Sequence, residues 1–341
     1  MNRKEYMERL WMDLQDLDHS TAEEIIQDFE HHFEQGRKEG RSEEEIAREL
    51  GDPSSLLDEL KTSEKTTIRE QVFHPQQEIR KLIIDAQCAN VLLKAAKGSQ
   101  VQVDFDDHRS PLGIQNFNLE TVQRDEVFEI RVEPRKRKFP LLSLSDLHLQ
   151  VAVPESMRDV VVRTTSGDGT IADLSQLDSL EIRSQSGDLK LSGLTVRSLI
   201  AQTTSGDVEL EEMEVELIQI RGVSGDLTLN EVNGSLGQLK TVSGDVEATN
   251  ARLTALLAES KSGDLELQLS GSEKLRCVTI SGDVKLQLHE CSGCDCEFKT
   301  VSGDFIDRRR SFVRQGNHYL QGDESLRVAV STVSGDLKVE C

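Results

Sequence analysis

The 341-residue sequence predicts a mainly β protein, a single-stranded-type parallel β-solenoid (β-helix) of about nine rungs of 19 residues, preceded by a small all-α domain. Three observations predict this fold class. The tripeptide Ser-Gly-Asp occurs nine times, and the five steps that join its copies from Ser186 to Ser281 are identical in length. Apolar and polar residues alternate on both sides of each copy, which is the period of a β-strand. The first sixty or so residues instead carry apolar residues three and four positions apart, the spacing of a helix face.

In this N-terminal segment, two capping boxes predict helix starts at Ser20 and Ser42, because each serine is followed three residues later by a glutamate. Gly36 and Gly51 predict the ends of these two helices, and Pro53 suits the first turn of a last one. The apolar residues expected to form the helical core are Tyr6, Met7, Leu10, Leu14, Leu17, Ile25, Ile26, Phe29, Phe33, Ile46, Ala47, Leu50, Leu56, Leu57 and Leu60.

Each repeat predicts two short strands that meet at the Ser-Gly-Asp corner. In one copy, Ile218 and Ile220 precede the corner and Leu227 and Leu229 follow it, both pairs at a spacing of two. A unit of this size cannot bury its apolar face alone, so copies are expected to stack with equivalent strands parallel and about 4.8 Å apart. No aromatic residue occurs between Phe139 and Phe298, which fits a narrow interior of small aliphatic side chains.

The repeated corner predicts a column of carboxylates. We expect the glycine to supply a positive φ, and the serine and aspartate to hydrogen-bond nearby backbone. Stacked carboxylates about 5 Å apart repel by about 0.8 kcal/mol per pair in water, which is tolerable if each accepts backbone N–H groups. We interpret the column as structural; a calcium ladder is the alternative, although the nine-residue calcium-binding repeat is missing. The column comprises Asp168, Asp188, Asp207, Asp226, Asp245, Asp264, Asp283, Asp304 and Asp336.

The pattern divides the chain into four parts. An acidic helical domain spans residues 1–62, and a polar linker spans residues 63–78. Residues 79–158 form an irregular β lead-in that caps one end of the solenoid. The solenoid spans 159–341 and contains an insertion at about 306–327. The last repeat is expected to end the solenoid without a capping segment, so the helical domain, the insertion or a second subunit would cover that end.

The six cysteines are expected to be reduced thiols, because the sequence shows no export signal. Cys291, Cys294 and Cys296 have a C-x-x-C-x-C spacing that could bind zinc, with Cys277 or His289 as the fourth ligand. Two of these, Cys277 and Cys296, also fall on interior positions of their repeats, where cysteine acts as a small apolar residue. We favour that structural reading, so no cofactor is expected, with zinc or calcium as the alternative.

Charge and composition exclude several function classes. A net charge of −22 argues against nucleic-acid partners and anionic membrane surfaces, and no apolar run approaches a membrane span. No histidine lies between His148 and His289, and outward polar positions vary from repeat to repeat, so we predict a protein without catalytic residues. We expect a cytoplasmic location, membrane-peripheral at most through a partner.

Two regions offer contacts for other proteins. The basic run Arg135–Lys138 predicts an exposed loop, which would suit an acidic partner such as the helical domain. The run Arg308–Arg310 belongs to the insertion, which breaks the regular surface. We expect a protein partner at residues 1–62 or at the insertion 306–327, and a homo-oligomer through the open solenoid end is a further option.

Both parts of the chain resemble known families. The stretches Asp28–Gly36 and Glu39–Pro53 resemble the HAAS signalling domain, a helical module of mainly Gram-positive bacteria, which implies a regulatory interaction role for residues 1–62. The Ser-Gly-Asp repeats, with the lead-in strands Asn90–Lys94 and Leu147–Pro154, resemble the bacterial putative-adhesin family of β-strand repeats, a domain of unknown function, over residues 79–341.

Together these observations favour a non-enzymatic β-solenoid that serves as a scaffold or binding protein and carries a regulatory helical module. The resemblance implies an envelope-stress or signalling role. The alternative is a cation-dependent adhesin or a solenoid enzyme that acts on a surface polysaccharide.

Overall fold

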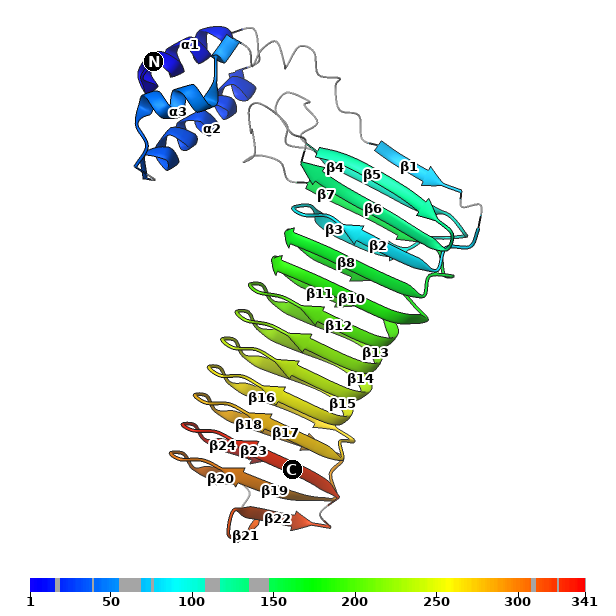
Figure 1. The fold of residues 1–341 in the computed structure, drawn as a ribbon. Coiled ribbons are helices and arrows are strands. Elements are labelled where there is room, and N and C mark those ends of the chain that lie inside the picture. Colours follow the sequence, from blue (N-terminus) through cyan, green and yellow to red (C-terminus); the bar gives the residue numbers. More distant parts are fainter. Residues whose placement is uncertain are drawn as a thin grey trace. The chain divides into compact units, whose positions relative to one another are not determined.

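The computed structural model describes residues 1–15, 19–38, 40–54, 69–74, 77–107, 117–134, 147–307, 311–323 and 325–340. The chain divides into two compact units. The first comprises Met1–Glu70, Asp104–Glu120 and Val132–His148, and the second comprises Gln71–Val103, Thr121–Arg131 and Leu149–Cys341. Helices occur at the N-terminus and strands fill most of the remaining described chain (Figure 1), so the predicted mainly β class with a small helical part is confirmed.

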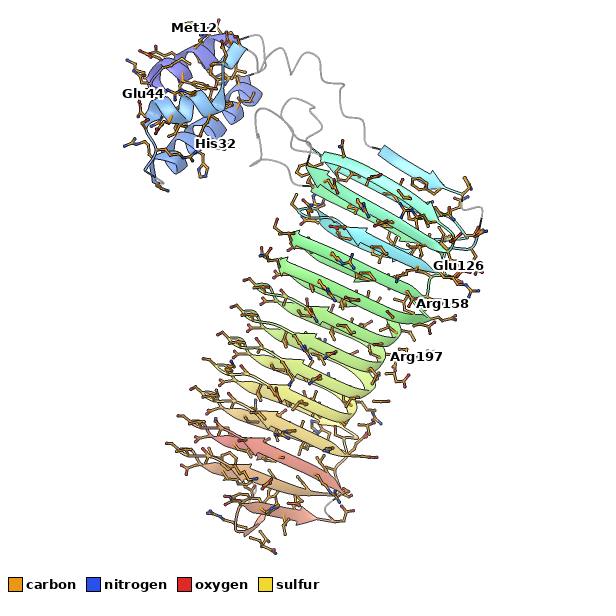
Figure 2. The ribbon with its side chains drawn as sticks, in the orientation of Figure 1. Met12, His32, Glu44, Glu126, Arg158 and Arg197 are labelled. Atoms are coloured by element: carbon orange, nitrogen blue, oxygen red, sulfur yellow. The ribbon has the colours of Figure 1, made fainter. Side chains whose placement is uncertain are left out.

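The N-terminal helices are α1 (Arg3–Asp13), α2 (His19–Lys38) and α3 (Glu43–Leu50). Their apolar faces meet in one core, in which the Tyr6 ring contacts Phe29 and Phe33 at centroid distances of 5.8 and 5.5 Å. Met12 and Glu44 lie on the surface of this unit (Figure 2). The buried core residues are Tyr6, Leu10, Leu14, Ala22, Ile25, Phe29, Phe33, Ile46, Ala47 and Leu50.

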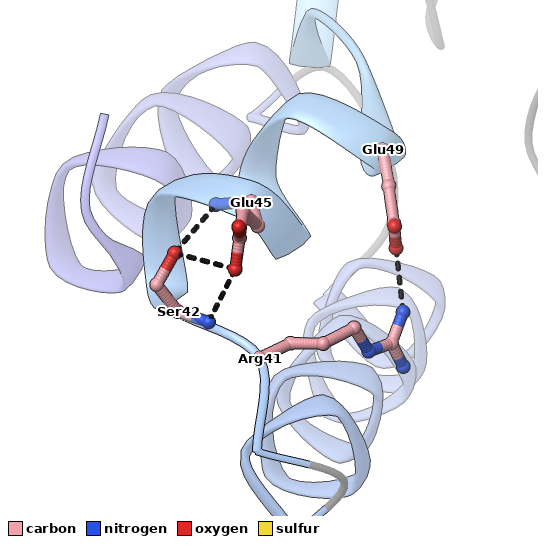
Figure 3. A network of polar contacts seen from close by, with 4 residues as sticks. All are labelled: Arg41, Ser42, Glu45 and Glu49. Atoms are coloured by element: carbon pink, nitrogen blue, oxygen red, sulfur yellow. Dashed lines mark hydrogen bonds and ion pairs between the residues drawn. The ribbon is translucent and has the colours of Figure 1, made fainter.

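The predicted capping box at Ser42 is confirmed (Figure 3). The Ser42 hydroxyl accepts the N–H of Glu45 at 3.3 Å, and the Glu45 carboxylate accepts the N–H of Ser42 at 2.9 Å. A second capping box, which the sequence reading missed, joins Asn2 and Glu5 at the start of α1. These bonds satisfy backbone donors that the first helical turn leaves unpaired.

One detail of the helix prediction is wrong. Helix α2 begins at His19, one residue before Ser20, so Ser20 lies inside the helix. The same helix ends at Lys38, near Gly36 as predicted. A Cβ on Gly36 would lie 2.6 Å from the Ile46 side chain, so the glycine permits close packing of α2 on α3. Leu17 and the last predicted helix, through Leu60, lie outside the described residues.

Strands of the second unit stack in parallel, and equivalent residues of successive repeats lie side by side. Leu199 pairs with Ile218, Ile218 with Gly237, and Gly237 with Leu256, each one repeat further along the chain. Figure 1 shows this succession from β8 to β18. The strands are β1 (Arg69–Phe73), β2 (Lys81–Asp85), β3 (Asn90–Ala95), β4 (Val101–Asp107), β5 (Phe117–Arg124), β6 (Val127–Pro134), β7 (Leu147–Val153), β8 (Asp159–Ser166), β9 (Gly169–Ala172), β10 (Leu177–Ser186), β11 (Leu189–Ser192), β12 (Thr195–Gln202), β13 (Val208–Arg221), β14 (Leu227–Lys240), β15 (Val246–Glu259), β16 (Leu265–Ser270), β17 (Lys274–Val278), β18 (Val284–His289), β19 (Gly293–Lys299), β20 (Phe305–Asp307), β21 (Val313–Gln315), β22 (His318–Gly322), β23 (Leu326–Ser331) and β24 (Leu337–Glu340).

The interior of this stack is aliphatic. Residues such as Leu199, Ile220 and Leu267 are buried, while their sequence neighbours face solvent at least in part. Phe128, toward one end, and Phe298, toward the other, are also buried. The aromatic-free stretch of the sequence therefore corresponds to the middle of the stack, where small side chains from each repeat fill a narrow interior.

The order of the stack departs from the order of the chain at both ends. The last repeat, β23 and β24, lies between β17–β18 and β19–β20. At the other end, β2 lies between β6 and β8. The expectation that the last repeat ends the solenoid is therefore wrong. The outermost repeat is β19–β20, and the insertion supplies the hairpin β21–β22, whose strand β22 pairs antiparallel with β19.

Candidate functional site

The nine corner aspartates lie in one hydrogen-bonded column. The Oδ1 atom of every aspartate except the last, Asp304, accepts the backbone N–H of the next aspartate at distances of 2.7 to 3.0 Å. This bond offsets the repulsion between neighbouring carboxylates, because each bonded charge faces a backbone donor. The order along the stack is Asp168, Asp188, Asp207, Asp226, Asp245, Asp264, Asp283, Asp336 and Asp304.

Asn90 begins the same column, which the sequence reading missed. Its side-chain oxygen accepts the N–H of Asp168 at 2.9 Å. The preceding residues are Cys88 and Ala89, so no Ser-Gly-Asp marks this corner. One sequence feature could have indicated the role of Asn90. It directly precedes the alternating residues Val91 and Leu93, and in the other repeats an aspartate stands at this position.

The corner glycines are required mainly because the corners stack closely. A Cβ on any of them would lie 2.0 to 2.4 Å from the carbonyl oxygen of the equivalent residue in the preceding corner. Their expected positive φ is present at Gly187, Gly206, Gly225 and Gly335. That expectation is wrong for the other five, whose φ lies outside the left-handed region: Gly167, Gly244, Gly263, Gly282 and Gly303.

The sequence-predicted zinc candidates lie mostly inside the solenoid. Cys277, Cys294 and Cys296 are fully buried, and burial raises the pKa of the Cys277 thiol and so disfavours the thiolate that zinc requires. Cys291 is half-buried, and its Sγ lies 3.0 Å from the Gly293 carbonyl oxygen, to which it donates. Among the residues described by the structure, no cluster of three or more His, Cys, Asp or Glu side chains could hold a metal ion.

A shallow polar groove of about 550 Å³ runs along one side of the stack. Figure 2 labels Arg158 and Arg197 on this side. The Arg197 guanidinium forms an ion pair with Asp178 at 3.0 Å and a longer one with Glu216 at 4.0 Å. Arg158 donates to the backbone carbonyl of Gln176 at 3.1 Å. These contacts join successive repeats, so they explain why the two arginines lie here, and no bound ligand is needed for that explanation.

A second cleft of about 560 Å³ lies at the outermost repeat. The rings of Phe305 and Tyr319 stack at 3.6 Å, and the Arg314 guanidinium lies 5.6 Å from the Tyr319 centroid. Phe312 packs edge-on against Phe305 at 5.5 Å. Asp304, the last carboxylate of the column, also lines this cleft. The insertion was singled out from its sequence as a contact site; its Arg308–Arg310 run, like Arg135–Lys138, lies outside the described residues.

An ionisable pair is among the contacts that hold the hairpin of the insertion. His318 Nδ1 lies 2.8 Å from Asp295 Oδ1, which joins β22 to β19. This hydrogen bond raises the pKa of His318 above its ordinary value.

The helical unit offers a different surface. Trp11, the only tryptophan of the chain, and Met12 expose 44% and 68% of their surface, although large apolar side chains are usually covered. Met1 is exposed as well. No helix of the described chain is long and apolar enough to cross a membrane.

Comparisons with known proteins agree with this architecture. The family model described as Toastrack DUF4097 matches residues 79–340, and the HAAS model matches residues 5–59. A solved structure named a putative adhesin from Parabacteroides merdae ATCC 43184 has a TM-score of 0.50 and 10% identity, and covers 82% of this chain and 99% of its own. Another putative adhesin, from Parabacteroides distasonis ATCC 8503, has a TM-score of 0.50 and 13% identity over 80% of this chain and 97% of its own. No curated protein matches the sequence.

Proposed function

The chain belongs to the Toastrack DUF4097 family, and from this premise we propose that it is a non-enzymatic scaffold or binding protein. Its working parts are a parallel β-solenoid of about nine 19-residue rungs and an N-terminal HAAS-type module that mediates regulatory interactions. The process it serves is envelope-stress response or signalling.

The observation that carries this proposal is the continuous ladder of corners. Successive corner carboxylates accept a backbone N–H, so the repeated polar groups hold neighbouring repeats in register instead of gathering into a reactive cluster. Such a stack is stiff, because each inner repeat is bonded on both sides to its neighbours. A rigid body with little chemistry of its own suits a protein that positions other proteins.

The helical unit supports the interaction part of the proposal. Its apolar residues form a closed core of their own, so Trp11 and Met12 are not needed for that core and face solvent. Exposed tryptophan and methionine are frequent anchors in protein interfaces. Residues 1–62 carry more acidic than basic side chains, which favours a partner of basic or neutral charge.

A crosslinking pull-down tests the proposal. The full chain, a chain that lacks residues 1–62, and the double variant Trp11→Ala/Met12→Ala are compared in a bacterial lysate. Leu217→Ala/Leu236→Ala is the matched control, because these two exposed leucines lie on the solenoid. We expect the full chain and the control to retain a partner that the other two lose. If no form of the protein retains a partner or self-associates, the scaffold function is refuted.

A further inference from the structure

Four backbone and carboxylate groups repeat at every corner and join it to the next one. In the corner of β10, the Gln185 carbonyl accepts the N–H of Ser205 at 2.9 Å, and the Gly187 N–H donates to the Ser205 carbonyl at 3.1 Å. The Asp188 carboxylate accepts the N–H of Asp207 at 2.9 Å. The Leu189 N–H donates to the Asp207 carbonyl at 2.8 Å.

The same four bonds join the last two corners of the stack. The Val333 carbonyl accepts the N–H of Ser302 at 3.0 Å, and the Gly335 N–H donates to the Ser302 carbonyl at 3.1 Å. The Asp336 carboxylate accepts the N–H of Asp304 at 2.9 Å, and the Leu337 N–H donates to the Asp304 carbonyl at 2.9 Å. The corner Val301–Phe305 is therefore the outermost one.

On its outer side, the corner Val301–Phe305 repeats these groups without a partner among the described residues. They are the Val301 carbonyl, the Gly303 N–H, the Asp304 Oδ1 and the Phe305 N–H. Val301 is 83% exposed, and Gly303 is exposed whereas the glycines of the other eight corners are half-buried. Phe305 is half-buried, whereas the equivalent residue of every other Ser-Gly-Asp repeat is buried. Among the described residues, the hairpin β21–β22 pairs with β19 and its Tyr319 ring stacks on Phe305, but no hydrogen bond joins the hairpin to the backbone of residues 301–304.

We propose that Val301–Phe305 is an open peptide-binding edge, which takes an extended, glycine-containing segment of another protein as the next corner of the stack. This proposal rests on the scaffold function proposed above and names its partner at the solenoid end. The interface continues the one that the chain already forms between its own corners, so its hydrogen-bond pattern is known in advance.

This geometry defines the chemistry of the incoming segment. The residue above Gly303 must be glycine, because a Cβ at the equivalent place in the inner corners lies 2.0 to 2.4 Å from the carbonyl oxygen below. The residues on either side of it must not be proline, because their N–H groups donate to Val301 and Asp304. An uncharged or basic residue is favoured after the glycine, since a further aspartate would extend the column of like charges.

The cleft beside the corner suits the rest of the segment. It is lined by Lys299, Asp304, Arg314, Asn317 and Tyr319, which offer donors, acceptors and a ring to the side chains that follow the glycine. A second copy of the chain is disfavoured as occupant, because each copy carries a net charge of −22 and would place its own Asp304 against the other.

The probe is a fluorescent peptide that copies residues 203–210 with Asp207 replaced by asparagine, because residues before Thr203 would meet β22, which already pairs with β19. Its binding to the full chain is measured by anisotropy. The control peptide differs only by Gly206→Ala. We expect the glycine peptide to bind and the alanine peptide to bind at least about tenfold more weakly. In the protein, Asp304→Ala removes one acceptor and should weaken binding several-fold, whereas the exposed control Glu216→Ala should not. Melting curves of both variants report folding.

Equal binding of the two peptides, no binding of either, or indifference to Asp304→Ala in a folded variant overturns the proposal. Sedimentation of the full chain supplies the remaining outcome: a dimer whose stability changes in Asp304→Ala, in either direction, would mean that a second copy occupies the edge, which also overturns it. The pull-down with the Trp11 and Met12 variants tests the helical surface separately. Failure of the peptide test can therefore be told apart from failure of the proposed scaffold function.

Discussion

Replacing one interior corner glycine by alanine provides a direct test of the stacking argument. In Gly263→Ala, the new Cβ would lie 2.0 Å from the Gly244 carbonyl oxygen and 2.6 Å from its carbon. Real Cβ atoms essentially never come within 3.0 Å of such an atom, so the two corners must separate by about 1 Å. Because φ of Gly263 lies outside the left-handed region, the effect is steric and not conformational.

The cost follows from the bonds that this separation stretches. Four hydrogen bonds join the two corners, including those from Ser262 to Val242 at 3.0 Å and from Asp264 to Asp245 at 2.8 Å. At about 1 kcal/mol net for each bond, we expect the free energy of unfolding to fall by about 3–5 kcal/mol. Each repeat depends on its neighbours, so the loss should affect the whole stack.

The assay is urea unfolding followed by circular dichroism in the β-sheet band. Gly271→Ala is the matched control: Gly271 has φ +65°, and its nearest atoms are Arg252 side-chain atoms at 3.7 Å and beyond. That control should lose only about 1 kcal/mol, from the left-handed backbone. If Gly263→Ala costs no more than Gly271→Ala, close corner stacking does not explain why the tripeptide recurs within this chain.

Three further outcomes are expected. Calcium or EDTA should leave the melting temperature unchanged, because the column carboxylates already accept backbone N–H groups; a rise with calcium would restore the calcium ladder. Because the pKa of His318 is raised, its bond to Asp295 stabilises the hairpin fully below about pH 6.5, and this stabilisation is lost as pH rises through the raised pKa. Hydrogen exchange of β22, corrected for the intrinsic pH dependence of exchange, should therefore be slower at pH 5.5 than at pH 8.5. The variant Asp295→Asn should abolish this difference. Cys277 and Cys296 should resist alkylation until urea unfolds the chain, and early labelling of either would contradict their burial.

Much of the fold could be predicted because neighbours in the stack are also regular neighbours in sequence. Leu199, Ile218 and Leu256 recur at whole multiples of the repeat length, and the structure pairs their strands in that register. The Ser42 capping box was predictable for a similar reason, since its two partners lie three residues apart. Local spacing and spatial contact coincide in both cases.

Parts of the candidate site were beyond this kind of prediction. Asn90 lacks the tripeptide, and only its bond to Asp168, 78 residues away, reveals its place in the column. The stacking of Phe305 on Tyr319 joins a strand to an insertion with no repeat of its own. Burial of Cys294 depends on the same long-range arrangement, although Cys277 and Cys296 could be assigned to the interior from their repeat positions.

By itself, the sequence determined the strand period, the register of the repeats and the aliphatic interior, because equivalent positions of each copy carry the same kind of residue. Only the tertiary structure decided the order of the end repeats and which corner remains open. Ser334-Gly335-Asp336 pairs with the corners at both Ser281 and Ser302, although the whole insertion separates it from the latter in sequence. Every corner offers the same four hydrogen-bonding groups, so the tripeptide alone does not select its neighbour; packing of the strands and the insertion around it does.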